Sequence, residues 1–156
     1  LQQTWHRIEQ QIPGTKFNFD FWTQNTPRRS TYPACRAVIA AKKLAGLQDE
    51  MTFGIQQAYY LQAKNPSDLD TLTDVAVQIG LDKDAFLSLM NSEQIHDLFA
   101  AEINQGRSMG LDSFPSLALQ IGNELHGIGL DYNSSENMLK QINTLLSSSD
   151  SQSSNI

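Results

Sequence analysis

The chain is short of cysteine, with only Cys35 among its 156 residues. A single thiol excludes an internal disulfide, and it excludes thiol–disulfide exchange that needs two thiols in the same chain. So low a cysteine content is typical of proteins from reducing compartments. We therefore expect a cytoplasmic protein.

Positive charge is also scarce. Eleven Lys and Arg residues stand against seventeen Asp and Glu, and the formal net charge is −6. Nucleic acids and anionic membranes attract basic surfaces, so we expect neither as a partner. No apolar run approaches the ~18 residues that cross a bilayer, and no basic-then-apolar leader opens the sequence. Length and the 40% hydrophobic content indicate one globular domain with its own core.

Helical periodicity fills most of the sequence, because apolar residues recur three or four positions apart. The predicted helices span residues 1–12, 34–44, 47–64, 69–79, 82–90, 92–105 and 134–146. Between the first two, Phe17, Phe19 and Phe21 alternate with polar residues, which predicts a half-buried extended segment. The sequence enters its first helix without an initiator Met, as a fragment or a processed product would.

Residues 109–129 interrupt the helical pattern. Ser116–Ile121 is short and apolar, Gly122-Asn123 is a two-residue turn signal, and Glu124–Ile128 can return as a second strand. A lone hairpin is marginal in water, so helices or further strands must cover it. Pro115 stands just before the first strand, and the residues alone leave open whether it is cis or an ordinary trans proline.

Two stretches carry a family resemblance. Asn25–Val38 reads Asn-Thr-Pro-Arg-Arg-Ser-Thr-Tyr-Pro-Ala-Cys-Arg-Ala-Val, and Phe17–Trp22 precedes it. Together they resemble the DsbA-like thioredoxin family, and more narrowly its cytoplasmic bacterial branch of protein-disulfide isomerases. Gly110–Leu119 is similar to the cis-proline loop of that family. The resemblance covers residues 1–146.

The resemblance implies an α+β fold that is mostly α. Residues 1–108 would be the helical insertion, residues 109–146 the C-terminal ββα half of a thioredoxin-like fold, and the Ser-rich residues 147–156 a disordered tail. The family's strand, Cys-X-X-Cys helix and second strand have no counterpart in this sequence. No catalytic residue can therefore be carried over, whereas Ser113, Phe114 and Pro115 are implied as the substrate-facing loop.

Cys35 permits two interpretations. It lies in the first turn of the helix that Pro33 begins, beside Arg36, where the positive end of the helix dipole favours a reactive thiolate. The alternative, which we prefer, is a small buried residue on the alanine-lined face of that helix. The histidines show no metal-ligand spacing, and we expect neither a metal nor another cofactor. They are His6, His96 and His126.

Three functions remain open. The chain is expected to be the substrate-binding and helical part of a thiol–disulfide oxidoreductase or isomerase, inactive alone, with protein or thiol substrates. The alternative is a non-catalytic interaction or adaptor module. A weaker one is a relative of the kappa-class glutathione-dependent isomerases. An unpaired hairpin edge invites pairing with another chain, so we also expect a homodimer.

Overall fold

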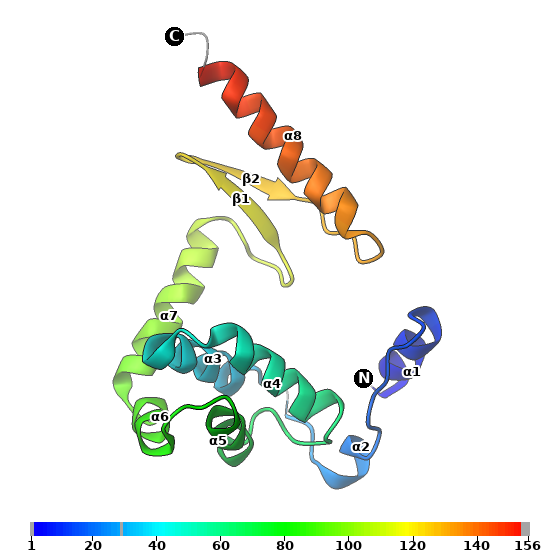
Figure 1. Cartoon of the computed structure of the whole chain (residues 1–156), viewed down its shortest axis with the longest axis vertical. Coiled ribbons are helices and arrows are strands. Elements are labelled where there is room, and N and C mark those ends of the chain that lie inside the picture. Colours follow the sequence, from blue (N-terminus) through cyan, green and yellow to red (C-terminus); the bar gives the residue numbers. More distant parts are fainter. Residues whose placement is uncertain (1, 29, 154–156) are drawn as a thin grey trace. The chain divides into compact units, whose positions relative to one another are not determined.

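The computed structural model describes residues 2–28 and 30–153, with side chains described as far as residue 148. The chain divides into two compact units, unit 1 (Leu1–Ala101) and unit 2 (Glu102–Ile156). Helices precede a two-stranded hairpin and a last helix in chain order (Figure 1). This confirms the predicted α+β fold that is mostly α. The division between the units falls within α7, earlier than the boundary at residue 108 that the sequence suggested.

The helices up to the division are α1 (Gln2–Gln11), α2 (Phe21–Gln24), α3 (Tyr32–Ala45), α4 (Gln48–Tyr60), α5 (Leu69–Gln78), α6 (Lys83–Met90) and α7 (Glu93–Ser108). The residues after it form β1 (Leu117–Ile121), β2 (Glu124–Ile128) and α8 (Ser135–Ser153). None of the helices in the described residues is long and apolar enough to cross a membrane.

The main core of unit 1 forms around the small residues of α3. Ala37, Ala40 and Ala41 are fully buried, so neighbouring helices come close to the α3 backbone. Gly54 allows a similar approach of α4 to α5, because a Cβ at Gly54 would lie 2.5 Å from Val75 Cγ1. The larger side chains that complete this core include Met51, Ile55, Leu72, Phe86, Leu89, Met90 and Ile95.

A second, aromatic core in unit 1 surrounds Trp5 of α1. The Trp5 side chain is 4% exposed, and its ring stacks on Phe17 with centroids 4.8 Å apart. Five more rings lie with centroids within 6 Å of it, and these belong to Phe19, Phe21, Trp22, Tyr59 and Tyr60. Residues from α1, α2 and α4 are thereby held in one cluster.

The prediction of an extended segment through Phe21 is wrong at its end. Residues 15–18 have no regular secondary structure, and Phe21 begins the short helix α2. The Asn18 side-chain oxygen accepts a hydrogen bond from the Asp20 N–H at 3.0 Å, a local turn that redirects the chain. The alternating phenylalanines serve the cluster around Trp5, because each of them contacts its ring.

In unit 2, β1 and β2 pair antiparallel with Leu117 opposite Ile128 and Ile121 opposite Glu124. Gly122 has φ +57, as the first central residue of a type II′ hairpin turn requires. The helix α8 packs against both strands. Among the residues of this small unit up to 148, Ile128 at the end of β2 is the buried hydrophobic one, with 6% of its surface exposed.

The last helix is longer than predicted. We expected it to close at Leu146 and residues 147–156 to be disordered, whereas α8 continues through Ser153. Hydroxyl groups support the extension, because Ser147 donates to the Asn143 carbonyl and Ser148 to the Thr144 carbonyl, both at 2.9 Å. These bonds satisfy the serine side chains inside the helix. Residues 154–156 lie outside the described residues.

Candidate functional site

The candidate site is the loop between α7 and β1, and its entry is fixed by the end of α7. The Leu111 N–H donates to the Gly106 carbonyl at 3.0 Å, and the Gly110 N–H donates to the Arg107 carbonyl at 2.9 Å. These two bonds form a Schellman motif, in which Gly110 takes the left-handed position with φ +72. The helix therefore ends just before Gly110, and the chain continues into the loop of residues 112–116.

The loop itself presents an aromatic ring. The Phe114–Pro115 peptide bond is cis, and 83% of Phe114 is exposed. The Ser116 hydroxyl donates to the Ser113 carbonyl, and the two hydroxyl oxygens are 3.4 Å apart. The structure thus brings Ser113, Phe114 and Pro115 together on one turn directly before β1.

Backbone groups of the loop are open for pairing. Among the hydrogen bonds of residues 2–28 and 30–153, none uses the backbone N–H or carbonyl of Phe114. The sheet that follows has only the strands β1 and β2, so within the described chain each strand has one unpaired edge. Unpaired strand edges and open loop groups can both take up an extended peptide.

The groups of this loop are suited to binding a ligand. Asp112 is the one ionisable residue in the sequence from Met109 to Ser116, and the loop contains no thiol. Ser113 and Ser116 hydroxyls are engaged with each other and with the Ser113 carbonyl. A ring, a proline and open peptide groups can hold an extended substrate, whereas electron transfer needs thiols that the loop lacks.

Cys35 does not belong to this loop, since it lies in unit 1. Its side chain is exposed, so the interpretation of a buried residue on the alanine-lined face is wrong. Cys35 lies in the first turn of α3, two positions before Ala37, where the buried stretch of this helix begins. Within the described residues, no three His, Cys, Asp or Glu side chains are grouped to hold a metal ion.

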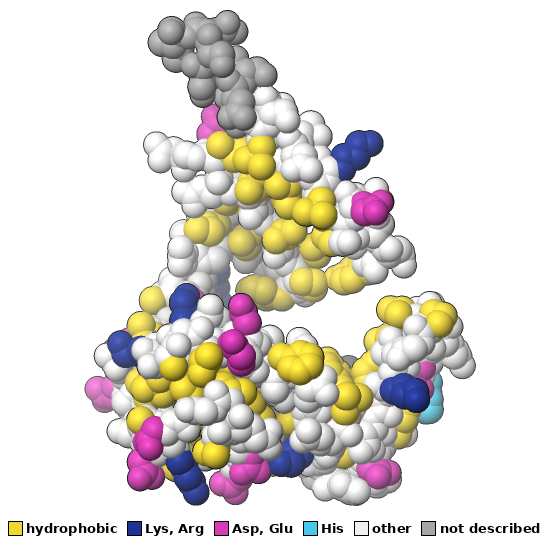
Figure 2. Space-filling view, in the orientation of Figure 1, with side chains coloured by type: hydrophobic (Ala, Val, Ile, Leu, Met, Phe, Trp, Pro, Cys, Tyr) yellow, Lys and Arg dark blue, Asp and Glu magenta, His cyan; other side chains and the backbone are white. Residues whose placement is uncertain are grey.

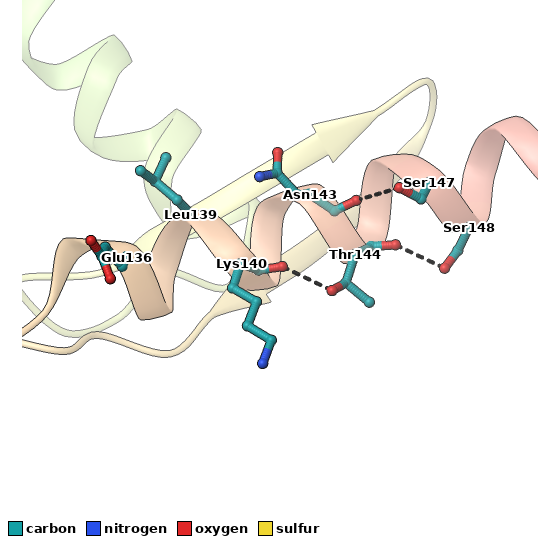
Figure 3. A pocket seen from close by; sticks show the side chains of 7 residues that line it. All are labelled: Glu136, Leu139, Lys140, Asn143, Thr144, Ser147 and Ser148. Carbon is teal, nitrogen blue, oxygen red and sulfur yellow. Dashed lines mark hydrogen bonds between the residues drawn. The ribbon is translucent and has the colours of Figure 1, made fainter.

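A shallow hollow of about 690 Å³ runs along the outer face of α8, which Figure 3 shows. Glu136, Leu139 and Lys140 line its first half. Thr144 and Ser148 line the second half, and the Thr144 hydroxyl already donates to the Lys140 carbonyl at 2.8 Å. The Thr144, Ser147 and Ser148 hydroxyls bond back to the helix, which leaves the Lys140 and Asn143 side chains as the donors of this face. Sequence analysis did not anticipate the hollow, since its residues share no signal in the sequence.

Comparisons with known proteins agree with this geometry. The sequence profile of the family described as DSBA-like thioredoxin domain matches residues 6–142. A solved structure from Nitrosomonas europaea, a candidate protein disulfide isomerase, superposes with a TM-score of 0.81 at 22% identity, and the match covers 94% of this chain and 72% of that one. The cytosolic disulfide reductase DsbM from Pseudomonas aeruginosa superposes with a TM-score of 0.70 at 25% identity, over 90% of this chain and 72% of DsbM. No curated protein sequence matches the chain significantly.

Proposed function

Because the chain belongs to the DSBA-like thioredoxin domain family, we propose that it is the substrate-binding and helical part of a thiol–disulfide oxidoreductase or protein-disulfide isomerase. The 156 residues contain one cysteine and therefore no dithiol. The redox centre would come from polypeptide outside this sequence. By itself the chain binds substrate and transfers no electrons.

Two neighbours support this chemistry. The structure from Pseudomonas aeruginosa is titled a cytosolic disulfide reductase, and a second structure of it, 24% identical to this chain, is titled as containing GSH. A reducing compartment also suits this chain, because its one thiol, that of Cys35, is exposed and forms no disulfide. We therefore propose a cytoplasmic location and protein or low-molecular-weight thiols as substrates.

The observation that carries the proposal is the exposed ring of Phe114 beside open backbone groups, directly before β1. An extended peptide can pair with the Phe114 N–H and carbonyl while one of its apolar side chains packs on the ring. Pro115 fixes the direction in which the chain enters β1, and Ser113 tightens the turn through Ser116. The loop thus selects an extended backbone over a folded one.

The binding part of the proposal is tested with the full chain and an unfolded, cysteine-free peptide with an apolar residue at its centre. Replacing Phe114 with Ala should weaken binding about tenfold, because covering most of a phenylalanine ring is worth roughly 1.5 to 3 kcal/mol. Tyr132→Ala is the matched control, since Tyr132 is also in unit 2 and is 78% exposed. Equal losses in the two variants would mean that the loop is not the binding site.

The redox part has its own test, insulin reduction with glutathione as the electron source. We expect no turnover above the glutathione background, because one thiol per chain cannot complete a dithiol cycle. Catalytic turnover by the purified chain would overturn the claim that its redox centre lies elsewhere. Turnover in this assay would not change the interpretation of the peptide-binding test.

A second proposal, a homodimer, concerns the apolar surface of unit 2. Leu117 and Leu125 in the hairpin are each at least 40% exposed, and Leu139 on α8 is 56% exposed. Figure 2 shows hydrophobic side chains at the surface of this part of the chain. Pairing of hairpin edges from two copies would cover such residues. A monomer by light scattering at high protein concentration would contradict it.

A further inference from the structure

Unit 1 contains a cavity of about 250 Å³, and none of its described lining residues belongs to the loop at Phe114. It lies among the end of α4, the start of α3, the segment after α2 and residues 65–67. Cavities that hold drug-sized ligands measure about 300 to 1,000 Å³. This one therefore suits a smaller molecule, about the size of a single substituted ring.

The walls of the cavity are apolar and well supported. Phe21 and Ile55 line it, and their exposed fractions are 2% and 8% because each belongs to one of the two buried cores. Ala34 closes the side formed by α3. The ring of Tyr59 stands edge-on to that of Phe21, with centroids 4.8 Å apart at 83°. Walls held by core packing form a site before any ligand arrives.

The charge of the lining is balanced. Among the lining residues that the structure describes, Arg28 is the one charged residue, and its Nη1 lies 3.1 Å from Asp68 Oδ1. The carboxylate that neutralises Arg28 thus comes from the protein itself. An additional buried charge on a ligand would lose its hydration without gaining a free counter-ion. The cavity consequently favours an uncharged molecule.

Several hydrogen-bonding side chains at the cavity remain available, among them Tyr59 and Gln56 of α4. Asn65 and Ser67 are already engaged, since the Asn65 amide donates to the Thr26 carbonyl and the Ser67 hydroxyl to the Ser30 carbonyl. In contrast, none of the hydrogen bonds among the described residues involves the Tyr59 hydroxyl or the Gln56 side-chain amide. Both residues line the cavity from α4. A ligand with one polar group can be held there in one orientation.

We propose that this cavity binds a small neutral aromatic molecule that carries one hydrogen-bonding group, of the aryl amide class. The aromatic ring fills the space between Phe21, Ile55 and Ala34, and the polar group bonds to Tyr59 and Gln56. Burial and the neighbouring Tyr60 raise the pKa of Tyr59, so its hydroxyl stays protonated and neutral over a wider pH range. This site is independent of the proposed redox function.

The test compares three probes of nearly equal shape: benzamide, benzoate and benzylamine. Each is titrated into the full chain labelled with ¹⁵N, and amide chemical shifts are followed. Benzamide should bind with a Kd of about 0.1 to 1 mM, as expected for so few atoms, and it should shift the amides of Ala34, Ile55 and Tyr59. Benzoate and benzylammonium should bind at least about tenfold more weakly.

Variants locate the site. Ala34→Leu should abolish benzamide binding by filling the cavity, and Tyr59→Phe, which keeps the ring volume, should weaken binding about tenfold through loss of the hydroxyl. Phe53→Ala changes an exposed residue of α4 (63% exposed) and should leave the affinity unchanged. Circular dichroism checks that each variant is folded. No binding, tighter binding of either charged probe, or unaltered affinity in Tyr59→Phe would overturn the proposal.

Discussion

Gln141 and Gly129 form a reciprocal pair of hydrogen bonds that joins α8 to the end of β2. The Gly129 N–H donates to Gln141 Oε1 at 2.9 Å, and Gln141 Nε2 donates to the Gly129 carbonyl at 3.1 Å. The side-chain amide thus pairs with the backbone as a neighbouring strand would. A Cβ at Gly129 would lie 3.3 Å from Gln141 Oε1, so the approach is close.

Replacing Gln141 with Ala should therefore loosen unit 2. Two hydrogen bonds are lost, and at about 0.5 to 1.5 kcal/mol each the free energy of unfolding should fall by about 1 to 3 kcal/mol. Hydrogen exchange of the Gly129 amide is the direct measurement, and its protection should drop. Asn143→Ala, at an exposed position two residues further along α8, is the control. Unchanged protection in Gln141→Ala would contradict the pairing.

Gly54 gives a prediction for unit 1. Because a Cβ there would meet Val75 Cγ1 at 2.5 Å, Gly54→Ala must displace the Val75 side chain or push α4 and α5 apart. Overpacking costs about 1 to 3 kcal/mol, more than the roughly 1 kcal/mol that alanine gains over glycine in a helix. We expect a lower midpoint of thermal unfolding by calorimetry.

Gly106 provides the matched control for that substitution. It lies in α7, and no atom is within 4 Å of a Cβ placed there. Gly106→Ala should accordingly stabilise the protein, by up to about 1 kcal/mol. Equal effects of the two substitutions would show that helix propensity, and not the contact with Val75, decides the outcome at Gly54.

Asp131 should make the start of α8 sensitive to acid. Its carboxylate accepts hydrogen bonds from the Asn137 side chain at 2.7 Å and from the Asn133 and Ser134 N–H groups at 2.9 and 3.0 Å. These bonds, that from Asn137 foremost, hold the pKa of Asp131 below its ordinary value. A lowered pKa in the folded chain means that the contribution to stability is present above the unfolded-state pKa and is lost as pH falls through the folded-state pKa.

Titration of the Asp131 carboxyl carbon by NMR checks this directly, with the urea-unfolded chain as the reference. The folded chain should give the lower midpoint. Asp131→Asn retains an acceptor oxygen for the turn and should remove this part of the acid sensitivity of unfolding. If the folded and unfolded midpoints coincide, the hydrogen bonds do not favour the ionised form.

Exposure of Cys35 predicts how the native chain reacts with thiol reagents. One equivalent of maleimide should add without denaturant, because the side chain is exposed on α3. Mass spectrometry counts the adduct, and Cys35→Ser should take up none. Labelling only after unfolding would mean that Cys35 is buried in the native chain.

Local signals made much of unit 2 predictable. Gly122-Asn123 between two apolar runs specifies a hairpin through the turn alone. Gly110 after a helical pattern specifies a helix end, and the loop with Pro115 follows from it. The end of α8 was harder, because its continuation depends on serine hydroxyls that bond back to the helix and not on apolar periodicity.

Other features, in unit 1, could not be predicted from the sequence. Alternating phenylalanines fit a strand and an irregular segment wrapped around Trp5 equally well, and only the tertiary contacts decide. The exposure of Cys35 could not be predicted from helix phase, since Ile39 lies one turn further on the same face of α3 and is buried. The cavity beside Tyr59 left no signal, because four separate segments create it.

The aromatic cluster around Trp5 has a practical consequence for the study of this chain. Both tryptophans, Trp5 and Trp22, lie in that cluster, and the sequence from Glu102 onward contains none. Intrinsic tryptophan emission therefore arises from unit 1 alone, and the hairpin and α8 contribute none of it. A tryptophan placed at the exposed Leu139 in a background of Trp22→Phe would give the second unit an optical signal of its own.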